Sequence, residues 1–101
     1  MSEFVKVARV GDIQPGSGKT VTLGATPVAL FNVDGQYYAI HNNCPHEDGP
    51  LGEGTLCGCV VTCPVHAYEF DVTSGACLTE PVYRVEQFEV RVDGEDILLR
   101  L

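Results

Sequence analysis

The sequence of 101 residues predicts one all-β domain, an antiparallel β-sandwich or barrel with a small subdomain inserted into it. Three observations predict this class. The apolar segments are short and alternate with polar residues, as strands with one buried face do. The 11 glycines and 6 prolines leave little room for long helices. Two Asp-Gly pairs lie between apolar runs, where tight hairpin turns are expected.

The first strands are predicted on either side of a glycine-rich segment. Phe4–Val10 places Lys6 and Arg9 among apolar residues, and Thr20–Leu23 is a short run with β-branched side chains. Gly16–Thr20 (Gly-Ser-Gly-Lys-Thr) resembles the end of a phosphate-binding loop. The full pattern needs a further glycine at position 13, which is Ile, and a helix afterwards. We therefore expect an ordinary turn followed by a strand.

Two hairpins are predicted from the Asp-Gly pairs, because such a turn matches the twist of paired strands. The expected strands are Val28–Val33 and Gln36–Ile40 around Asp34-Gly35, and Phe88–Val92 and Asp96–Leu101 around Asp93-Gly94.

The middle of the chain gives weaker signals. Val60–Cys63 and Tyr68–Val72 are short strand candidates, and Thr73–Gly75 (Thr-Ser-Gly) is a turn. Residues 82–90 fit one helical turn or a strand. No segment shows a sustained helical stripe, and we find no repeat or linker.

The charge balance excludes several function classes. Lys and Arg number 6 and Asp and Glu number 14, which gives a net charge of −8. Such a surface repels nucleic acid and anionic membranes, and it favours a partner with a basic patch. No window reaches the roughly 20 apolar residues of a membrane span. The start of the chain has no signal-peptide pattern. We therefore expect a cytoplasmic protein.

The candidate site is concentrated in one stretch. Residues 41–70 contain four of the five cysteines and all three histidines but few strand signals. An odd number of cysteines cannot all pair in disulfides, and clustered Cys and His in a reducing compartment indicate a metal. We expect a single domain over 1–101, with a subdomain of about 41–70 inserted between scaffold segments 1–40 and 71–101.

The strongest motif is a pair of Cys/His segments. Cys44-Pro45-His46 is followed after sixteen residues by Cys63-Pro64-Val65-His66. Each segment offers one thiolate and one imidazole, and its proline stiffens the loop. Two such loops side by side would supply two sulfur and two nitrogen ligands.

This spacing resembles the signature of Rieske [2Fe–2S] proteins, and the resemblance covers essentially the whole chain. The segments similar to Rieske-type ferredoxins are Asn43–His46, Gly52–Leu56, Cys63–Asp71 and Thr73–Gly75. The resemblance implies one [2Fe–2S] cluster, with Cys44 and Cys63 on one iron and His46 and His66 on the other.

Other ligand sets are weaker. Two Cys and two His also suit zinc, although zinc sites usually contain Cys-x₂₋₄-Cys pairs. An all-Cys cluster that recruits Cys57 and Cys59 would leave both histidines of the motif unexplained. We interpret Cys57 and Cys59 as reduced turn or core thiols and Cys77 as a small buried side chain, with a Cys57–Cys77 bridge left open. His41 matches no ligand position.

The resemblance also predicts a low reduction potential. Respiratory Rieske proteins carry a disulfide between the two ligand loops, and the matching positions here are Gly49 and Val65. They also carry a serine hydroxyl that hydrogen-bonds a cluster sulfide, and the matching residue here is Tyr68, whose longer side chain is expected to point into the fold. A lost donor to sulfur lowers the potential. We expect a value on the order of −150 mV, the low end of the Rieske range.

The function implied is that of a soluble one-electron carrier rather than an enzyme. The chain resembles the ferredoxin component of bacterial aromatic-ring dioxygenases, which takes electrons from an NAD(P)H-dependent flavoprotein reductase and passes them to a terminal oxygenase. We expect a monomer that meets partners with basic docking patches. The alternatives are the small subunit of an NADH-dependent nitrite reductase and the ferredoxin of a monooxygenase.

Overall fold

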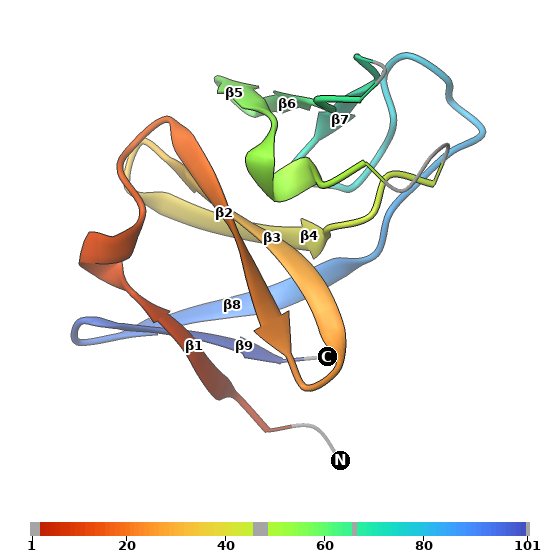
Figure 1. Cartoon of the computed structure of the whole chain (residues 1–101). Helices are drawn as coiled ribbons and strands as arrows, with labels where there is room; N and C mark the ends of the chain where they lie inside the picture. Colours follow the sequence, from red (N-terminus) through yellow and green to blue (C-terminus); the bar gives the residue numbers. More distant parts are fainter. Residues whose placement is uncertain (1–2, 46–48, 66, 101) are drawn as a thin grey trace.

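The computed structural model describes residues 3–45, 49–65 and 67–100. These residues form two antiparallel β-sheets, one of six strands and one of three. The described segments contain no α-helix, only the 3₁₀ turns η1 (Val10–Asp12) and η2 (Leu51–Glu53). The predicted all-β class is confirmed (Figure 1).

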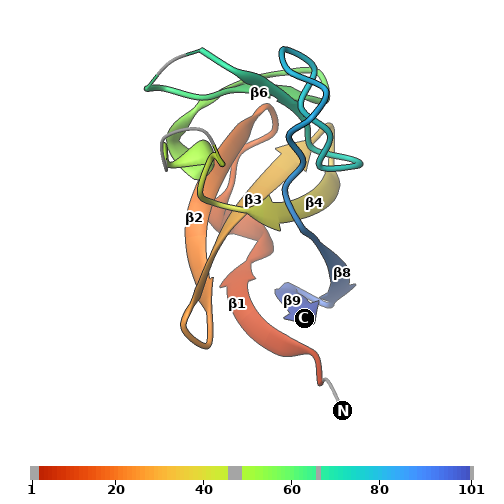
Figure 2. The same cartoon turned by 90° about the vertical axis from the view of Figure 1, so that its right-hand side faces the viewer.

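The large sheet is the scaffold, and its strand order is β1-β9-β8-β4-β3-β2. The strands are β1 (Val5–Arg9), β2 (Ser17–Leu23), β3 (Thr26–Val33), β4 (Gln36–His41), β8 (Gln87–Asp93) and β9 (Asp96–Arg100). The edge strand β1 also contacts the opposite edge, β2, so the sheet curls into a nearly closed barrel (Figure 2). The small sheet, β5 (Thr55–Cys57), β6 (Val60–Thr62) and β7 (Glu69–Asp71), lies above one end of it.

One predicted hairpin turn is confirmed and the other is off by one residue. Asp34 and Gly35 have φ angles of 55° and 90°, which is a type I′ turn between β3 and β4. In the second hairpin Asp93 pairs with Asp96, so the turn residues are Gly94 and Glu95 rather than Asp93-Gly94. Only Gly94 has a positive φ, 64°, as in a type II′ turn.

The glycine-rich segment is a strand, as the missing features of a phosphate-binding loop predicted. Strand β2 begins at Ser17, three residues earlier than expected, and pairs with β3 along its whole length. A Cβ atom at Gly18 would lie 2.5 Å from ring carbons of Phe31, so glycine is needed where the strand crosses that ring.

The middle of the chain contains one strand that was not predicted, and the structure decides between the two interpretations of residues 82–90. Strand β5 gave no signal that we recognised, since Thr55–Cys57 is only three residues long. Within 82–90 the strand interpretation is correct: Arg84 bridges Ala76, and β8 begins at Gln87.

Strand β3 is buried on both faces and divides the core in two. Val28 and Leu30 pack with Ile97 and Leu99 inside the barrel. Ala29 and Phe31 pack on the other face, under the small sheet, in a cluster that also contains Ile40, Leu51, Val61, Phe70, Val72, Val85 and three cysteines. The strand period of two therefore couples the barrel to the subdomain that carries the candidate ligands.

Candidate metal centre

Cys44 and Cys63 come from separate loops and belong to the same hydrophobic cluster. Cys44 follows β4 after two residues, and Cys63 follows β6 directly. Their exposed fractions are 0% and 2%. Gly49 joins the two loops, because the Cys44 N–H donates to its carbonyl at 3.0 Å and a Cβ built on it would lie 2.4 Å from the Cys63 Sγ.

The two loops run side by side. The same Cβ at position 49 would be 3.2 Å from the Cβ of Val65, so the two positions that matched the respiratory disulfide are adjacent in space. His46 and His66, together with Glu47 and Asp48, lie outside the described residues. Two buried sulfurs on adjoining loops, inside an apolar cluster, are a donor set that fits the sulfur half of an iron–sulfur centre.

The first loop is fixed to the barrel by the side chain of Asn42. Its Oδ1 accepts hydrogen bonds from the Thr20 hydroxyl at 3.0 Å and from the Gly52 N–H at 2.8 Å. Its carbonyl accepts from the Leu51 N–H at 2.7 Å. Asn42 is only 6% exposed, so both of its oxygens are satisfied inside the protein. The loop between Asn42 and Leu51 therefore has fixed ends.

The second loop is closed by backbone hydrogen bonds. The Cys63 N–H donates to the Tyr68 carbonyl at 2.8 Å, and the Ala67 N–H donates to the Cys63 carbonyl at 3.0 Å. Ala67 has a φ of 64°, in the left-handed region that costs a non-glycine residue roughly 1–2 kcal/mol. The loop keeps this strained residue next to His66.

A third segment, residues 77–84, borders the second ligand loop. The Leu78 N–H donates to the Glu69 carbonyl at 2.7 Å, which ties the segment to β7. The rings of Tyr83 and Tyr68 lie 6.0 Å apart. Leu78 and Val82 are 51% and 81% exposed, and Val65 of the second ligand loop is 55% exposed. We call Val65, Leu78 and Val82 the apolar rim.

Tyr68 packs against the same hydrophobic cluster as the two cysteines, in agreement with the expectation that it points into the fold. Loss of solvation raises the pKa of its phenol, and the nearby Tyr83 and Glu80 raise it further. The phenol is therefore neutral at physiological pH, since the ordinary value is already 10.0.

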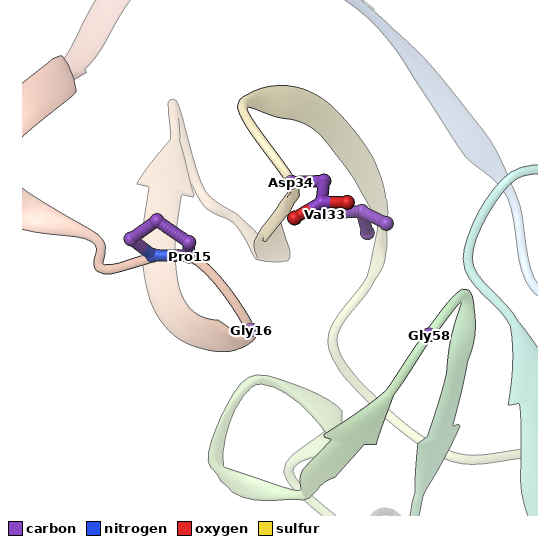
Figure 3. Close-up of a pocket in the computed structure, with 5 residues that line it drawn as sticks. All are labelled: Pro15, Gly16, Val33, Asp34 and Gly58. Atoms are coloured by element: carbon purple, nitrogen blue, oxygen red, sulfur yellow. The ribbon is translucent and has the colours of Figure 1, made fainter.

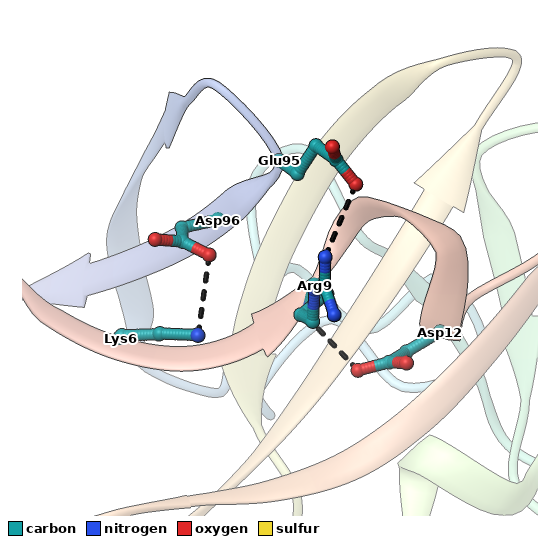
Figure 4. A network of polar contacts seen from close by, with 5 residues as sticks. All are labelled: Lys6, Arg9, Asp12, Glu95 and Asp96. Atoms are coloured by element: carbon teal, nitrogen blue, oxygen red, sulfur yellow. Dashed lines mark hydrogen bonds and ion pairs between the residues drawn. The ribbon is translucent and has the colours of Figure 1, made fainter.

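The basic residues are unevenly distributed along the chain. No Lys or Arg occurs between Lys19 and Arg84, whereas that stretch contains seven acidic residues. Four of the six basic residues lie on β1, β8 and β9. There Lys6 pairs with Asp96 and Arg9 with Glu95, each at 3.2 Å (Figure 4). These exposed pairs add little stability. The stretch between Lys19 and Arg84, which contains both ligand loops, therefore carries negative formal charge only.

The remaining cysteines are not placed to be ligands. Cys59 and Cys63 lie at opposite ends of β6, and four extended residues span roughly 13 Å. Cys57 and Cys59 are exposed, Cys77 is 4% exposed, and none of the three is in a disulfide. The distance between Cys59 and Cys63 argues against the all-Cys alternative, and Cys57 and Cys77 are not bonded to each other in the structure. His41 has a local role, since its Nδ1 accepts the Asn43 N–H at 3.1 Å.

Comparison with known proteins agrees with this geometry. The family model described as "Rieske [2Fe-2S] domain" matches residues 3–97. The chain belongs to the Rieske [2Fe–2S] family. The expected resemblance and the Rieske-type [2Fe–2S] cofactor are confirmed, and zinc is set aside.

Among curated Rieske relatives, "Ferredoxin CarAc" of Metapseudomonas resinovorans is 39% identical, over 91% of this chain and 94% of that protein. "Biphenyl dioxygenase ferredoxin subunit" of Pseudomonas sp. (strain KKS102) is 35% identical, over 95% and 90%. These relatives are electron-transfer components of multicomponent systems, which agrees with the expectation that this Rieske protein is not an enzyme on its own.

Solved Rieske structures give the same fold. The ferredoxin in the complex of reduced oxygenase and oxidised ferredoxin of carbazole 1,9a-dioxygenase is 36% identical, with a TM-score of 0.86 over 95% of this chain and 91% of that one. A putative NADH-dependent nitrite reductase small subunit from Mycobacterium tuberculosis is 25% identical, with a TM-score of 0.91 over 100% and 96%. In the part of this chain that the structure describes, no helix has the length and apolarity of a membrane span.

Proposed function

We propose that this Rieske protein is a one-electron carrier that takes electrons from an NAD(P)H-dependent flavoprotein reductase and delivers them to a terminal oxygenase. The observation that carries the proposal is the 39% identity to a ferredoxin over nearly the whole of both chains. Because NAD(P)H is a cytoplasmic reductant, we place the carrier in the cytoplasm. We also propose that it is a monomer. The domain spans 1–101, with a cluster-binding subdomain of about 41–70.

The proposed ligands are Cys44 and Cys63 for one iron and His46 and His66 for the other. The meeting of the Cys44 and Cys63 loops at Gly49 supports the sulfur half. The cluster, when bound, accepts and releases one electron. The protein keeps the two sulfurs in an apolar cluster that excludes water, and Asn42 and the backbone bonds around Cys63 fix both loops. Groups that hold the ligands in place from outside the centre orient them and tune its properties.

The proposed potential is low, on the order of −150 mV. Gly49 and Val65 have their Cβ positions 3.2 Å apart, close to the spacing at which cysteines form a disulfide. The residues at these positions, rather than their separation, therefore prevent the bridge. Tyr68 packs against the core cluster in place of a short hydroxyl side chain. Such a potential suits a carrier supplied by NAD(P)H.

The proposed docking surface is the apolar rim, Val65, Leu78 and Val82. These residues belong to the acidic stretch between Lys19 and Arg84. Exposed apolar side chains provide a small interface that forms and separates quickly. The negative field around them attracts a basic patch on the reductase or the oxygenase and speeds encounter.

The proposal is tested by reconstitution. The protein with its cluster is mixed with NADH, a ring-dioxygenase flavoprotein reductase and a terminal oxygenase, and the visible spectrum is followed. We expect catalytic amounts of reductase to reduce the cluster by one electron, and the oxygenase to reoxidise it. Gel filtration addresses the nitrite reductase alternative, whose solved small subunits are 25–28% identical to this chain. A carrier elutes as a monomer, whereas stable co-elution with a large flavoprotein subunit would contradict the proposal.

A further inference from the structure

The β5–β6 hairpin ends in Cys57-Gly58-Cys59, a segment that the electron-transfer site does not use. Cys57 pairs with Val60 at the end of the ladder, so Gly58 and Cys59 are the two turn residues. Gly58 has a φ of 60° and Cys59 does not have a positive φ, which defines a type II′ turn with glycine at its first central position. The turn therefore fixes the backbone positions of the two cysteines, which are separated by one residue.

These two thiols are the accessible ones. Cys57 and Cys59 are exposed, whereas the other three cysteines are buried in the core cluster. A Cβ on Gly58 would meet nothing within 4 Å, so the tip is uncrowded. Beside it is a cavity of about 260 Å³ lined by Pro15, Gly16, Val33, Asp34 and Gly58 (Figure 3). A small reagent in solution can therefore approach the tip.

The spacing of the two cysteines permits a bond between them. Two residues of fully extended chain span about 7 Å at most, and a turn shortens this distance. Disulfides form when the two Cα atoms lie about 4.4–6.8 Å apart. The ring closed by residues 57 and 59 would be very small, and the ladder from Thr55–Thr62 to Cys57–Val60 limits its adjustment. Strained and exposed disulfides are the readily reduced ones, so such a bond would be reversible rather than a structural staple.

We propose that Cys57 and Cys59 form a reversible dithiol–disulfide pair whose oxidant is a low-molecular-weight disulfide. One thiol loses its proton, and its thiolate attacks the small disulfide, which forms a mixed disulfide and releases one small thiolate. The second cysteine also loses its proton, and its thiolate attacks the mixed disulfide and releases the other small thiolate. The two released thiolates take up the two protons. The net change is two protein thiols and one small disulfide to one protein disulfide and two small thiols. The cluster takes no part.

Glutathione is the probe for the test. The protein with its cluster is equilibrated without oxygen at graded ratios of reduced to oxidised glutathione. Remaining thiols are then alkylated, and the peptides are analysed by mass spectrometry. We expect a single transition in which the peptide containing residues 57–59 loses two hydrogen atoms, is protected from alkylation, and recovers when reduced glutathione is added. The visible spectrum of the cluster should not change.

Three variants make the assignment specific. Cys57→Ser and Cys59→Ser should each stop at a mixed disulfide with glutathione on the remaining thiol, while Cys77→Ser, the buried control, should titrate like the wild type. Two glutathione molecules bound separately at 57 and 59 would overturn the proposal, as would full alkylation of both thiols in oxidised glutathione. Cluster loss in step with oxidation would also overturn it, because the oxidised thiols would then be Cys44 and Cys63. The wild-type peptide map decides the question even if a variant fails to fold.

Discussion

Gly49 lies directly against the sulfur of Cys63. A Cβ at position 49 would be 2.4 Å from that Sγ and 3.0 Å from the Val65 Cγ2, distances that no side chain tolerates without movement. Since the Gly49 carbonyl also accepts the Cys44 N–H, one residue sets the separation of the two sulfur-bearing loops. Glycine is needed here for close approach rather than for an unusual backbone angle.

We expect Gly49→Ala to displace Cys63 and to lower the iron content of the purified protein. Overpacking of this kind costs about 1–3 kcal/mol. Iron per chain and the visible spectrum measure the effect. Gly11→Ala is the matched control, because a Cβ there meets nothing within 4 Å. Equal iron content in the two variants would mean that the loops can separate without harm.

The ligand assignment predicts a division among the Cys and His residues. His46→Ala and His66→Ala should each abolish the rhombic EPR signal of the reduced Rieske cluster, because each removes a proposed nitrogen ligand. Cys59→Ser should leave the signal intact, since its thiol is exposed at the far end of β6. A normal signal in either histidine variant, or its loss in Cys59→Ser, would show that the ligands are misassigned.

Asn42 predicts a graded loss of stability. Asn42→Ala removes an oxygen that accepts from Thr20 and Gly52 and leaves the Gly52 N–H without that acceptor in a buried place. An unsatisfied buried group costs about 1–3 kcal/mol. Thr20→Val removes only the hydroxyl donor and should cost less, about 1 kcal/mol. Urea unfolding of both proteins measures the order, and a larger loss for Thr20→Val would contradict the role of Asn42 in fixing the first loop to the barrel.

The turns and strands with strong local patterns could be predicted from the sequence, and those with weak patterns could not. Asp34-Gly35 was predictable because both turn residues require positive φ, which this pair tolerates. The second turn was predicted one residue too early. Glycine can be the second turn residue, as in an Asp-Gly type I′ turn, or the first, as in a type II′ turn, and the sequence does not distinguish these two positions for Gly94. Strand β5 is three residues long, too short for a period of two to be visible.

The candidate site was predictable in its ligands but not in its supports. The Cys/His spacing is fixed by the chemistry of the centre, so it is visible in the chain itself. Gly49 against Cys63 and Asn42 against Gly52 are contacts between segments whose distance depends on the whole fold. The exposed side chains of the apolar rim come from two separate segments, and their exposure is not visible in any local pattern.

Ala67 predicts a stabilising substitution. Its φ of 64° is unfavourable for alanine, and Ala67→Gly removes that strain of roughly 1–2 kcal/mol. Glycine also makes the unfolded chain more flexible, which offsets about 0.4–1 kcal/mol. We expect a net gain of about 0.5–1 kcal/mol in the free energy of unfolding. Ala67→Val should lose stability, because a β-branched side chain tolerates this angle worse. Denaturant titration of the three proteins measures the free energy of unfolding. A lower value for Ala67→Gly than for the wild type would contradict the presence of strain at Ala67.

The apolar rim predicts a defect in partner binding without a defect in the cluster. Val82 is 81% exposed, so Val82→Ser removes apolar surface from the proposed interface while touching no core contact. We expect an unchanged spectrum and potential, and a severalfold lower rate of electron delivery to the terminal oxygenase at limiting carrier concentration. Val92→Ser on β8 is the control, since Val92 is also exposed but lies on the scaffold sheet.

The acidic stretch between Lys19 and Arg84 predicts how the rate of electron delivery to the oxygenase depends on salt. Attraction between a negative carrier and a basic partner is screened over about 8–10 Å at 0.1–0.15 M ionic strength. The association rate should therefore fall as salt rises, and it should fall in parallel for the wild type and Val82→Ser, because the substitution changes apolar contact and not charge. Stopped-flow reduction of the oxygenase by the pre-reduced carrier measures both effects. A rate that does not change with salt would exclude electrostatic steering, and equal rates for Val82→Ser and Val92→Ser would place docking elsewhere.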